Sequence, residues 1–294
     1  MQKIITNLWF KSNEDITEAI NLYTSLFNGK ILSTQYYTSS DFPRGKEGDI
    51  LTIEFELNNQ KYIAINGGPG FDFTPAISLS VECESEEQIN NLYNKLVEDG
   101  SVLMELQKYD FSEKYAWIQD KFGLSWQLSL TKTPLKITPS FLFVGKQAGK
   151  AEEAINLYTS LFPDSKINMI SRYQDGNDKD RIMYAQFELF GQTFAAMDSG
   201  LEHKFTFNEA VSLMVDCKDQ QEVDFYWNKL TGDGGEESMC GWLKDKFGVS
   251  WQIVPTELND LLNNSDKDKA VKAVQAMLQM QKIDIQKIKD AVNN

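Results

Sequence analysis

Apolar residues recur along this chain first with helical and then with strand-like spacing, and the whole pattern occurs twice. Residues 18–27 and residues 153–162 both read EAINLYTSLF. Within each segment, apolar side chains fall at positions i, i+3, i+4, i+7 and i+8, which predicts a helix with one continuous apolar face. The apolar positions of the first copy are Ala19, Leu22, Tyr23, Leu26 and Phe27.

Alternation of apolar and polar residues predicts strands around these helices. Apolar side chains occupy every second position of 51–57, so Thr52, Glu54 and Glu56 are expected on the opposite face. Further strands are predicted at 4–10, 62–66, 77–83, 125–130, 137–144, 194–198, 211–217 and 250–254. Two more helices are predicted, at 86–98 and 220–230.

The repeat extends over most of the chain. WIQDKFGLSWQ at 117–127 matches WLKDKFGVSWQ at 242–252, and SLSVEC matches SLMVDC in the same order. The sequence therefore predicts two homologous modules, residues 1–132 and 136–256, and a helical tail, residues 257–294. In the tail, Asp266 and Asp284 are expected to begin two helices. Their apolar stripe is expected to pack on its own chain, or alternatively on a second subunit of a homodimer.

Composition excludes several classes of partner. The chain of 294 residues carries 29 Lys and Arg against 43 Asp and Glu, a formal net charge of −14, and no basic run. Nucleic acids and anionic membranes attract clustered positive charge, so neither is an expected partner. No apolar stretch approaches the roughly 20 residues of a membrane-spanning helix. The first ten residues lack the basic start and apolar core of a signal peptide, so a cytoplasmic location is expected.

The polar faces of the predicted strands are expected to line a cleft between two strongly curved sheets. Side chains two residues apart on a strand share a face, and this rule selects a set of hydroxyl, amide and carboxylate groups with apolar walls that suits a small-molecule ligand. A solvated sheet surface or interface packing is the alternative interpretation. The predicted ligand-binding residues are Trp9, Thr52, Glu54, Glu56, Ser78, Ser80, Ser125, Gln127, Leu142, Gln186, Glu188, Ser212, Met214, Ser250 and Gln252.

The duplicated plan, the EAI-x-x-Y-x-S-L-F helix and the ending CGWLKDKFGVSWQIVP together resemble a known family. They are similar to the PhnB-like branch of the vicinal oxygen chelate superfamily, which includes glyoxalase I, bleomycin-resistance proteins and extradiol dioxygenases. This branch is often labelled 3-demethylubiquinone-9 3-methyltransferase-like. The resemblance implies an α+β fold of tandem βαβββ modules with curved mixed sheets.

The resemblance also implies where a metal would bind. Metal-using relatives carry His, Glu or Gln ligands on four strands, and these fall on pairs of positions in the two modules: Asn7 and Ser140, Glu54 and Gln186, Ala76 and Ala210, Gln127 and Gln252. Alanine has no donor atom, and amides are weak ligands beside carboxylate or imidazole. We therefore expect no catalytic metal or other cofactor, although a divalent metal stays the alternative.

The other reactive residues give weaker signals. The glycine-rich segment 66–70 leads to another strand instead of a helix, which argues against a nucleotide or S-adenosylmethionine loop and favours a flexible hairpin connection. Cys83 and Cys217 have acidic neighbours and are interpreted as buried structural thiols, whereas Cys240 is either structural or reactive. His203, the one histidine, is expected in an exposed loop.

Three functions are compatible with these residues. The first is metal-independent binding of a small molecule, in the manner of bleomycin-resistance relatives, which the missing ligands and the acidic surface favour. The second is a divalent-metal-dependent lyase, isomerase or dioxygenase of the glyoxalase type, in which Glu54 acts with Glu56 or Glu188. The third is a ligand-free structural or regulatory dimer. Methyl transfer is not expected.

Overall fold

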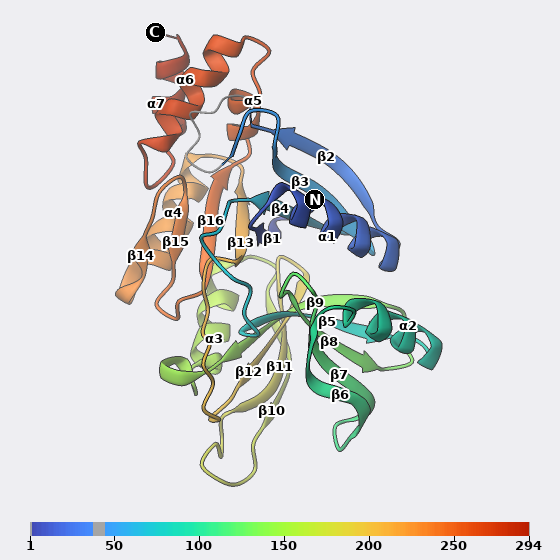
Figure 1. The fold of residues 1–294 in the computed structure, drawn as a ribbon. Coiled ribbons are helices and arrows are strands. Elements are labelled where there is room, and N and C mark those ends of the chain that lie inside the picture. The colour runs from blue at the N-terminus through green and yellow to red at the C-terminus, as the bar shows by residue number, and fades with distance from the viewer. Residues whose placement is uncertain (1, 38–44, 294) are drawn as a thin grey trace. The chain divides into compact units, whose positions relative to one another are not determined.

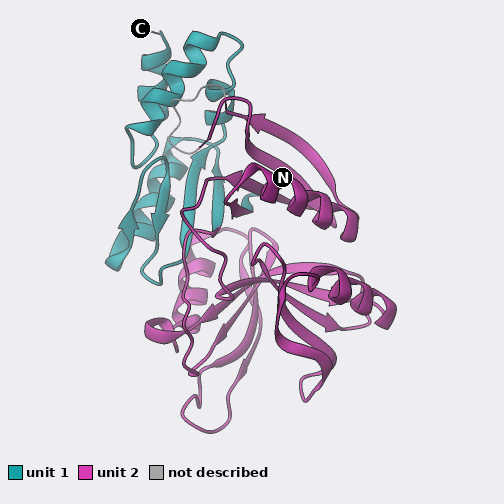
Figure 2. Ribbon diagram, viewed as in Figure 1, with its two compact units in different colours: residues 1–5, 212–294 teal, residues 6–211 magenta. Residues whose placement is uncertain are grey.

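The computed structural model describes residues 2–37 and 45–293 (Figure 1). The chain divides into two compact units. Unit 1 contains residues 1–5 and 212–294, and unit 2 contains residues 6–211 (Figure 2). These units do not coincide with the two repeats. The division of the chain into the modules 1–132 and 136–256 and the tail 257–294 therefore stays a prediction.

Each repeat consists of two smaller motifs, and each motif is a strand, a helix and three further strands. Motif 1 contains β1 (Ile4–Phe10), α1 (Asn13–Leu26), β2 (Lys30–Tyr36), β3 (Ile50–Leu57) and β4 (Gln60–Asn66). Motif 2 contains β5 (Ile77–Cys83), α2 (Glu86–Leu96), β6 (Ser101–Tyr109), β7 (Ser112–Gln119) and β8 (Ser125–Leu130).

The second repeat has the same plan. Motif 3 contains β9 (Lys136–Phe143), α3 (Ala151–Leu161), β10 (Lys166–Arg172), β11 (Ile182–Leu189) and β12 (Gln192–Asp198). Motif 4 contains β13 (Val211–Cys217), α4 (Gln220–Thr231), β14 (Glu236–Glu237), β15 (Trp242–Lys244) and β16 (Ser250–Pro255). Short 3₁₀ turns lie at Gly145–Gln147 and Gly232–Gly234.

Six strands of this plan, β2, β6, β7, β10, β14 and β15, have no counterpart in the sequence-based prediction, and β11 is not among the ranges predicted from alternation. Four of these strands, β2, β6, β10 and β14, are edge strands. The first four residues of both β2 and β10 are exposed, so these strands lack a buried face and the alternation that would reveal them. The predicted module of five strands and two helices is therefore corrected to two βαβββ motifs.

Motifs 2 and 3 share one mixed sheet, which lies wholly in unit 2. Its strand order is β10-β11-β12-β9-β5-β8-β7-β6. The central strands β5 and β9 are antiparallel, whereas β8 is parallel to β5 and β12 is parallel to β9. Helices α2 and α3 pack against this sheet. The sheet thus joins the second half of the first repeat to the first half of the second.

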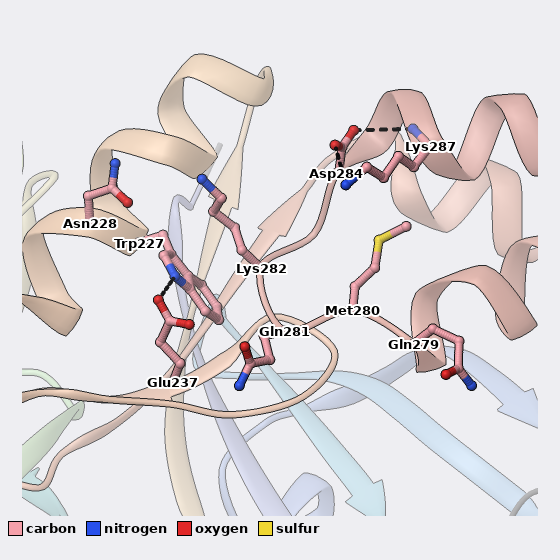
Figure 3. Close-up of a pocket in the computed structure, with 9 residues that line it drawn as sticks. All are labelled: Trp227, Asn228, Glu237, Gln279, Met280, Gln281, Lys282, Asp284 and Lys287. Carbon is pink, nitrogen blue, oxygen red and sulfur yellow. Dashed lines mark hydrogen bonds and ion pairs between the residues drawn. The ribbon is translucent and has the colours of Figure 1, made fainter.

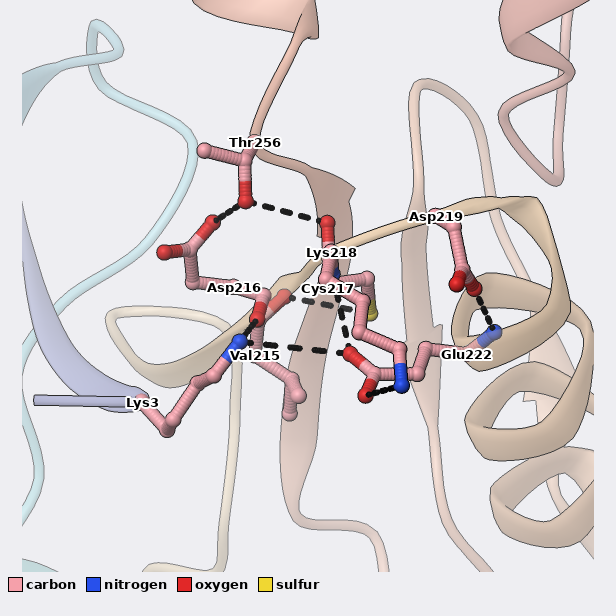
Figure 4. Close-up of polar contacts among 8 residues, drawn as sticks. All are labelled: Lys3, Val215, Asp216, Cys217, Lys218, Asp219, Glu222 and Thr256. Atoms are coloured by element: carbon pink, nitrogen blue, oxygen red, sulfur yellow. Dashed lines mark hydrogen bonds and ion pairs between the residues drawn. The ribbon is translucent and has the colours of Figure 1, made fainter. Parts of the chain in front are cut away.

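The strands of motif 1 follow the order β1-β4-β3-β2, and those of motif 4 follow the order β14-β15-β16-β13. In unit 1, the start of the chain runs beside β13, where the Asp216 amide donates to the Lys3 carbonyl at 3.0 Å. The Lys3 ammonium in turn donates to the Asp216 carbonyl (Figure 4). The fold is therefore α+β with mixed sheets, as the resemblance implied.

Helix α1 is placed as predicted, but its buried face is turned slightly. Its fully buried residues are Ile16, Ala19, Ile20 and Tyr23, whereas the predicted Leu22 and Leu26 are half-buried. Ser12 begins the helix, because its side chain accepts a hydrogen bond from the Asp15 amide. The predicted alternation of β3 is confirmed, since Ile53, Phe55 and Leu57 are buried and the residues between them are half-buried.

The tail forms α5 (Leu258–Leu262), α6 (Lys267–Leu278) and α7 (Ile285–Asn293). Asp266 caps α6 and Asp284 precedes α7, so both predicted helix starts are confirmed. The three helices bury Leu258, Ala273, Ile283, Ile288 and Val292 in one cluster, with Met277 and Met280 packed against it. The methionine-containing stripe therefore packs on its own chain.

Candidate functional site

Small polar side chains lie opposite one another at the centre of the unit 2 sheet. Ser78 of β5 pairs with Ser140 of β9, and Ser80 pairs with Thr138. Directly opposed residues of an antiparallel pair point to the same side of a sheet. Four hydroxyl groups therefore gather on one side, which we call the polar face, and three of them are nearly inaccessible, with Ser78 and Ser140 1% exposed and Thr138 3% exposed.

Gln127 of β8 is held on the polar face by two hydrogen bonds. Its Nε2 donates to the Ser78 hydroxyl at 2.6 Å, and its Oε1 accepts from the Tyr115 hydroxyl at 2.8 Å. Burial raises the pKa of Tyr115, so this hydroxyl keeps its proton and remains a donor. On the same side, the Trp117 indole donates to the Ser125 hydroxyl at 2.8 Å. The central hydroxyl groups are thus flanked by an amide and two aromatic side chains.

Two of the central hydroxyl groups have no hydrogen-bond partner within residues 2–37 and 45–293. Thr138 Oγ1 and Ser140 Oγ are both buried and unpaired among the described residues. A hydroxyl group that loses water without gaining a partner costs about 1–3 kcal/mol. A ligand that supplied donors or acceptors to this pair would recover that free energy on binding. Thr138 was not among the predicted site residues, and Ser140 was named only as a position to which the resemblance assigns a metal ligand. Their alternation with Ile137 and Phe141 would have placed both on this face.

Strands β9, β12 and β11 extend the polar face with two more predicted residues. Leu142 follows Ser140 by two positions on β9 and therefore shares its side of the sheet. Gln186 pairs with Ala195, which pairs in turn with Ser140. Seven of the predicted residues are thus placed along one face of a single sheet: Ser78, Ser80, Ser125, Gln127, Leu142, Gln186 and Glu188.

Glu188 lies at the margin of this set and is already engaged. It accepts a hydrogen bond from Asn168 at 2.9 Å and forms an ion pair with Lys166 at 3.4 Å. The Asn168 hydrogen bond and the Lys166 charge hold the pKa of Glu188 below its usual range. Its carboxylate is therefore charged and partnered by groups of the neighbouring strand β10.

The predicted residues of β3 also have partners on adjacent strands. Glu54 pairs with Lys61 of β4 at 2.7 Å, and Glu56 pairs with Lys30 of β2 at 3.2 Å. The Thr52 hydroxyl donates to the side-chain Oε1 of Gln35 on β2 at 3.3 Å. All three side chains lie on the side of β3 opposite the buried residues, as the alternation predicted.

The remaining predicted residues of the second repeat belong to unit 1. Gln252 of β16 donates to the Ser212 hydroxyl at 2.9 Å, which repeats the bond between Gln127 and Ser78. Ser250 Oγ is buried without a hydrogen-bond partner among the residues that the structure describes. Met214 follows Ser212 by two positions on β13. The same polar arrangement therefore occurs once in each unit.

The positions that the resemblance assigned to metal ligands do not fit a divalent ion. In residues 2–37 and 45–293, no three His, Cys, Asp or Glu side chains are grouped as ligands. The Gln127 amide is hydrogen-bonded to Ser78 and Tyr115, and the carboxylate of Glu54 forms an ion pair with Lys61. The groups at these positions are hydroxyls, amides and alanines, with a single carboxylate, and hydrogen bonding is the chemistry that they offer.

Asp120 has a role that sequence reasoning missed. It is 3% exposed, and its Oδ1 accepts the backbone N–H groups of Phe122 and Leu124, both at 3.0 Å. Its Oδ2 accepts the Tyr23 hydroxyl at 2.6 Å and the Trp126 indole at 2.8 Å. Burial outweighs these four hydrogen bonds and raises the pKa of Asp120 to about 6.

Asp245 repeats this arrangement in unit 1. Its carboxylate accepts the amides of Phe247 and Val249, and the Trp251 indole at 2.9 Å. The repeated DKFG-x-SW segment is therefore a buried turn in which one carboxylate satisfies donors of the following strand. The sequence feature that could have revealed this role is the identical spacing of Asp, Gly and Trp in both repeats. It indicates a structural turn rather than a catalytic acid.

The glycine-rich segment after β4 is not a hairpin connection. It leads from β4 to β5, which belong to different strand orders. The Trp9 indole donates to the Gly68 carbonyl at 2.8 Å, and a Cβ atom at Gly67 would lie 2.1 Å from the Trp9 ring. The segment is thus packed on Trp9, whose ring it covers, and Trp9 is 7% exposed.

Two of the three thiols are structural, as predicted. Cys83 and Cys217 are fully buried, and burial raises the pKa of each to about 12. The charges of Glu222 and Asp216 add to this effect at Cys217, whereas burial alone raises the value at Cys83. Around Cys217, the Thr256 hydroxyl donates to the Cys217 carbonyl at 3.1 Å (Figure 4).

His203 is half-buried, not fully exposed as predicted. It lies in the segment between β12 and β13, and its Nε2 is 2.8 Å from the Ser199 hydroxyl. Its ring packs against Phe205 at a centroid distance of 4.9 Å. These two contacts fix the ring within its own segment.

The tandem βαβββ motifs and mixed sheets are those of the glyoxalase fold. The chain belongs to the family described as 3-demethylubiquinone-9 3-methyltransferase, whose sequence model matches residues 2–129 and 135–254. The chain is similar to a putative 3-demethylubiquinone-9 3-methyltransferase, the PhnB protein of Bacillus cereus, with 44% identity. That match covers 44% of this chain and 100% of the other, with a TM-score of 0.41.

Longer structural matches show the fold alone. Glyoxalase I from Zea mays is 12% identical, and the match covers 90% of this chain and 98% of that chain with a TM-score of 0.55. No curated protein sequence matched the chain. Within the described residues, no helix has the length and apolar character needed to cross a membrane.

Proposed function

We propose that this chain binds a small, uncharged organic molecule on the polar face of the unit 2 sheet, without a catalytic metal. The observation that carries the proposal is the pair of buried hydroxyl groups of Thr138 and Ser140, which have no hydrogen-bond partner in the described part of the chain. They lie beside Ser78 and Gln127, which already hydrogen-bond to each other. A site built from neutral hydroxyl and amide groups favours a neutral hydrogen-bonding ligand, because a buried ion would lack a countercharge.

The aromatic residues near these groups support an organic ligand. Trp117 and Tyr115 lie on the same side of the sheet and are held by Ser125 and Gln127. Aromatic rings with a few fixed polar groups are typical of small-molecule sites. Methyl transfer is not part of the proposal, because the glycine-rich segment packs on Trp9 and leads to β5, a strand.

The first test is a thermal-shift screen of chelator-treated protein against uncharged hydroxylated and aromatic metabolites and antibiotics. A ligand present at 100 times its dissociation constant stabilises a protein by about 2.7 kcal/mol. The proposal predicts a shift that persists in EDTA. A shift that vanishes in EDTA and returns with a divalent metal would favour the glyoxalase-type enzyme instead. If the whole library left the melting temperature unchanged, a ligand-free role would be favoured.

Thr138→Val is expected to separate ligand binding from folding. Valine fills nearly the same volume and removes the unpaired hydroxyl group, so the unliganded protein should be unchanged or more stable by up to about 1 kcal/mol. The same change should weaken binding of any compound found in the screen about fivefold or more, because one hydrogen bond is lost. Chemical denaturation and calorimetric titration measure the two effects.

Thr193→Val serves as the matched control, since Thr193 is a half-buried threonine of β12 that pairs with Glu188 at the margin of the polar face. It should leave the affinity unchanged. An unaltered affinity in Thr138→Val would remove this hydroxyl group from the binding site and contradict the proposal.

A further inference from the structure

Unit 1 contains a cavity of about 340 Å³ that is lined by none of the predicted site residues. It lies between α4, β14 and the segment 279–284 that joins α6 to α7 (Figure 3). Cavities that hold small organic molecules in proteins begin at about 300 Å³. This cavity is therefore large enough for one small ligand, and it lies wholly within unit 1.

The tail side of the cavity is fixed by backbone hydrogen bonds. The Cys240 amide donates to the Met280 carbonyl, and the Gly241 amide donates to the Gln281 carbonyl, both at 2.7 Å. Two residues further on, Ile283 is fully buried in the tail cluster. Because this segment is already fixed in the unliganded chain, little conformational entropy is lost when a ligand binds against it.

Both lysines of the lining have anionic partners. Lys282 pairs with Asp224 of α4 at 2.7 Å, and Lys287 pairs with Asp284 at 3.5 Å. Asp284 also accepts the Lys287 amide at 3.1 Å, so it is held at the start of α7. The positive charges of the cavity are thus compensated by the chain itself.

Glu237 differs from the other charged groups of the lining. Its Oε1 accepts the Trp227 indole at 2.9 Å, which orients the carboxylate. Within the described parts of the chain, no lysine, arginine or histidine forms an ion pair with it. The thioether of Met280 supplies polarisable atoms to the same cavity, and the Trp227 ring, which is 2% exposed, forms part of its wall (Figure 3).

We propose that this cavity binds a small organic ammonium ion that carries an apolar group. The ammonium would pair with the Oε2 atom of Glu237, and the apolar group would contact Trp227 and Met280. An oriented carboxylate next to an indole ring and a thioether is a favourable environment for an organic cation. The net charge of −14 also raises the local concentration of cations at the surface.

The test is an NMR titration of the full chain with 2-phenylethylamine, observed at the Trp227 indole N–H signal. That signal is assigned by its loss in Trp227→Phe, and it reports directly on the hydrogen bond to Glu237. The proposal predicts a saturable shift with 2-phenylethylamine and none with the uncharged 2-phenylethanol. Glu237→Gln should weaken the affinity about fivefold, as expected for the loss of a solvent-exposed ion pair.

Glu236→Gln provides the matched control. Glu236 is the adjacent residue of β14, is also exposed and carries the same charge, but it does not line the cavity. It should leave the affinity unchanged, as should Thr138→Val in unit 2. The absence of a saturable shift, or an equal loss in Glu236→Gln and Glu237→Gln, would overturn the proposal. Neither result would bear on the polar face, since the two sites share no residue.

Discussion

Asp120→Ala is expected to lower the free energy of unfolding by about 4 kcal/mol, the largest effect of any substitution considered for this chain. The substitution leaves four donors without an acceptor: the amides of Phe122 and Leu124, the Tyr23 hydroxyl and the Trp126 indole. The Leu124, Tyr23 and Trp126 bonds are buried, so these donors would lose the carboxylate where water is not available to replace it, whereas the Phe122 amide is partly buried. Urea denaturation followed by circular dichroism measures the change.

Asp110→Ala is the control for this substitution, because Asp110 is an exposed turn residue between β6 and β7. It should change stability by no more than about 0.5 kcal/mol. Equal effects of the two substitutions would show that the four hydrogen bonds of Asp120 do not stabilise the fold.

The raised pKa of Asp120 also predicts a pH dependence. Its value rises from 3.8 to about 6 in the folded chain, so between these values the folded state binds more protons than the unfolded state. The stabilising contribution of Asp120 is therefore greatest below about pH 4 and falls as the pH rises through about 6, by up to about 3 kcal/mol. The stability difference between wild type and Asp120→Ala should accordingly be larger at pH 4 than at pH 7.

Gly67→Ala is expected to destabilise the fold by about 2–3 kcal/mol, the second-largest effect. The added Cβ would lie 2.1 Å from the Trp9 ring, well inside van der Waals contact. Trp9 cannot move away freely, because its indole donates to the Gly68 carbonyl and its ring packs against Phe71 at 5.2 Å. The thermal midpoint and the denaturation midpoint should both fall.

Gly70→Ala tests the same segment without the clash. A Cβ at Gly70 meets Trp9 at 3.7 Å, an ordinary contact distance. This change should be neutral within about 0.5 kcal/mol. If Gly67→Ala were equally neutral, the segment would be a flexible connection, as the sequence alone suggested.

Local periodicity predicted the elements that have one buried face. In β3, apolar Ile53 and Phe55 alternate with polar residues, and in α1 Ala19 and Tyr23 recur with helical spacing. The edge strands β2 and β10 could not be found in this way, because their side chains are exposed on both faces. Their pairing with β3 and β11 stabilises them, and that pairing is not a local property.

The candidate site could be predicted only in part. Alternation placed Ser78 and Gln127 on one side of their strands, and the structure joins them by a hydrogen bond. That Ser78 lies opposite Ser140 could not be predicted. The two residues are 62 positions apart in the sequence and meet only through the antiparallel pairing of β5 with β9. Pairing between separate motifs depends on the packing of whole sheets rather than on local pattern.

The most direct test of the polar face is a crystal structure of the wild-type chain with a compound from the screen, measured with anomalous diffraction. The account predicts electron density for the compound within hydrogen-bond distance of Ser140 and Thr138, and no anomalous peak at Gln127 or Gln186. A metal peak coordinated by these amides together with Glu54 or Glu188 would contradict it. Density for the compound at another surface, with Thr138 and Ser140 still unpartnered, would contradict it equally.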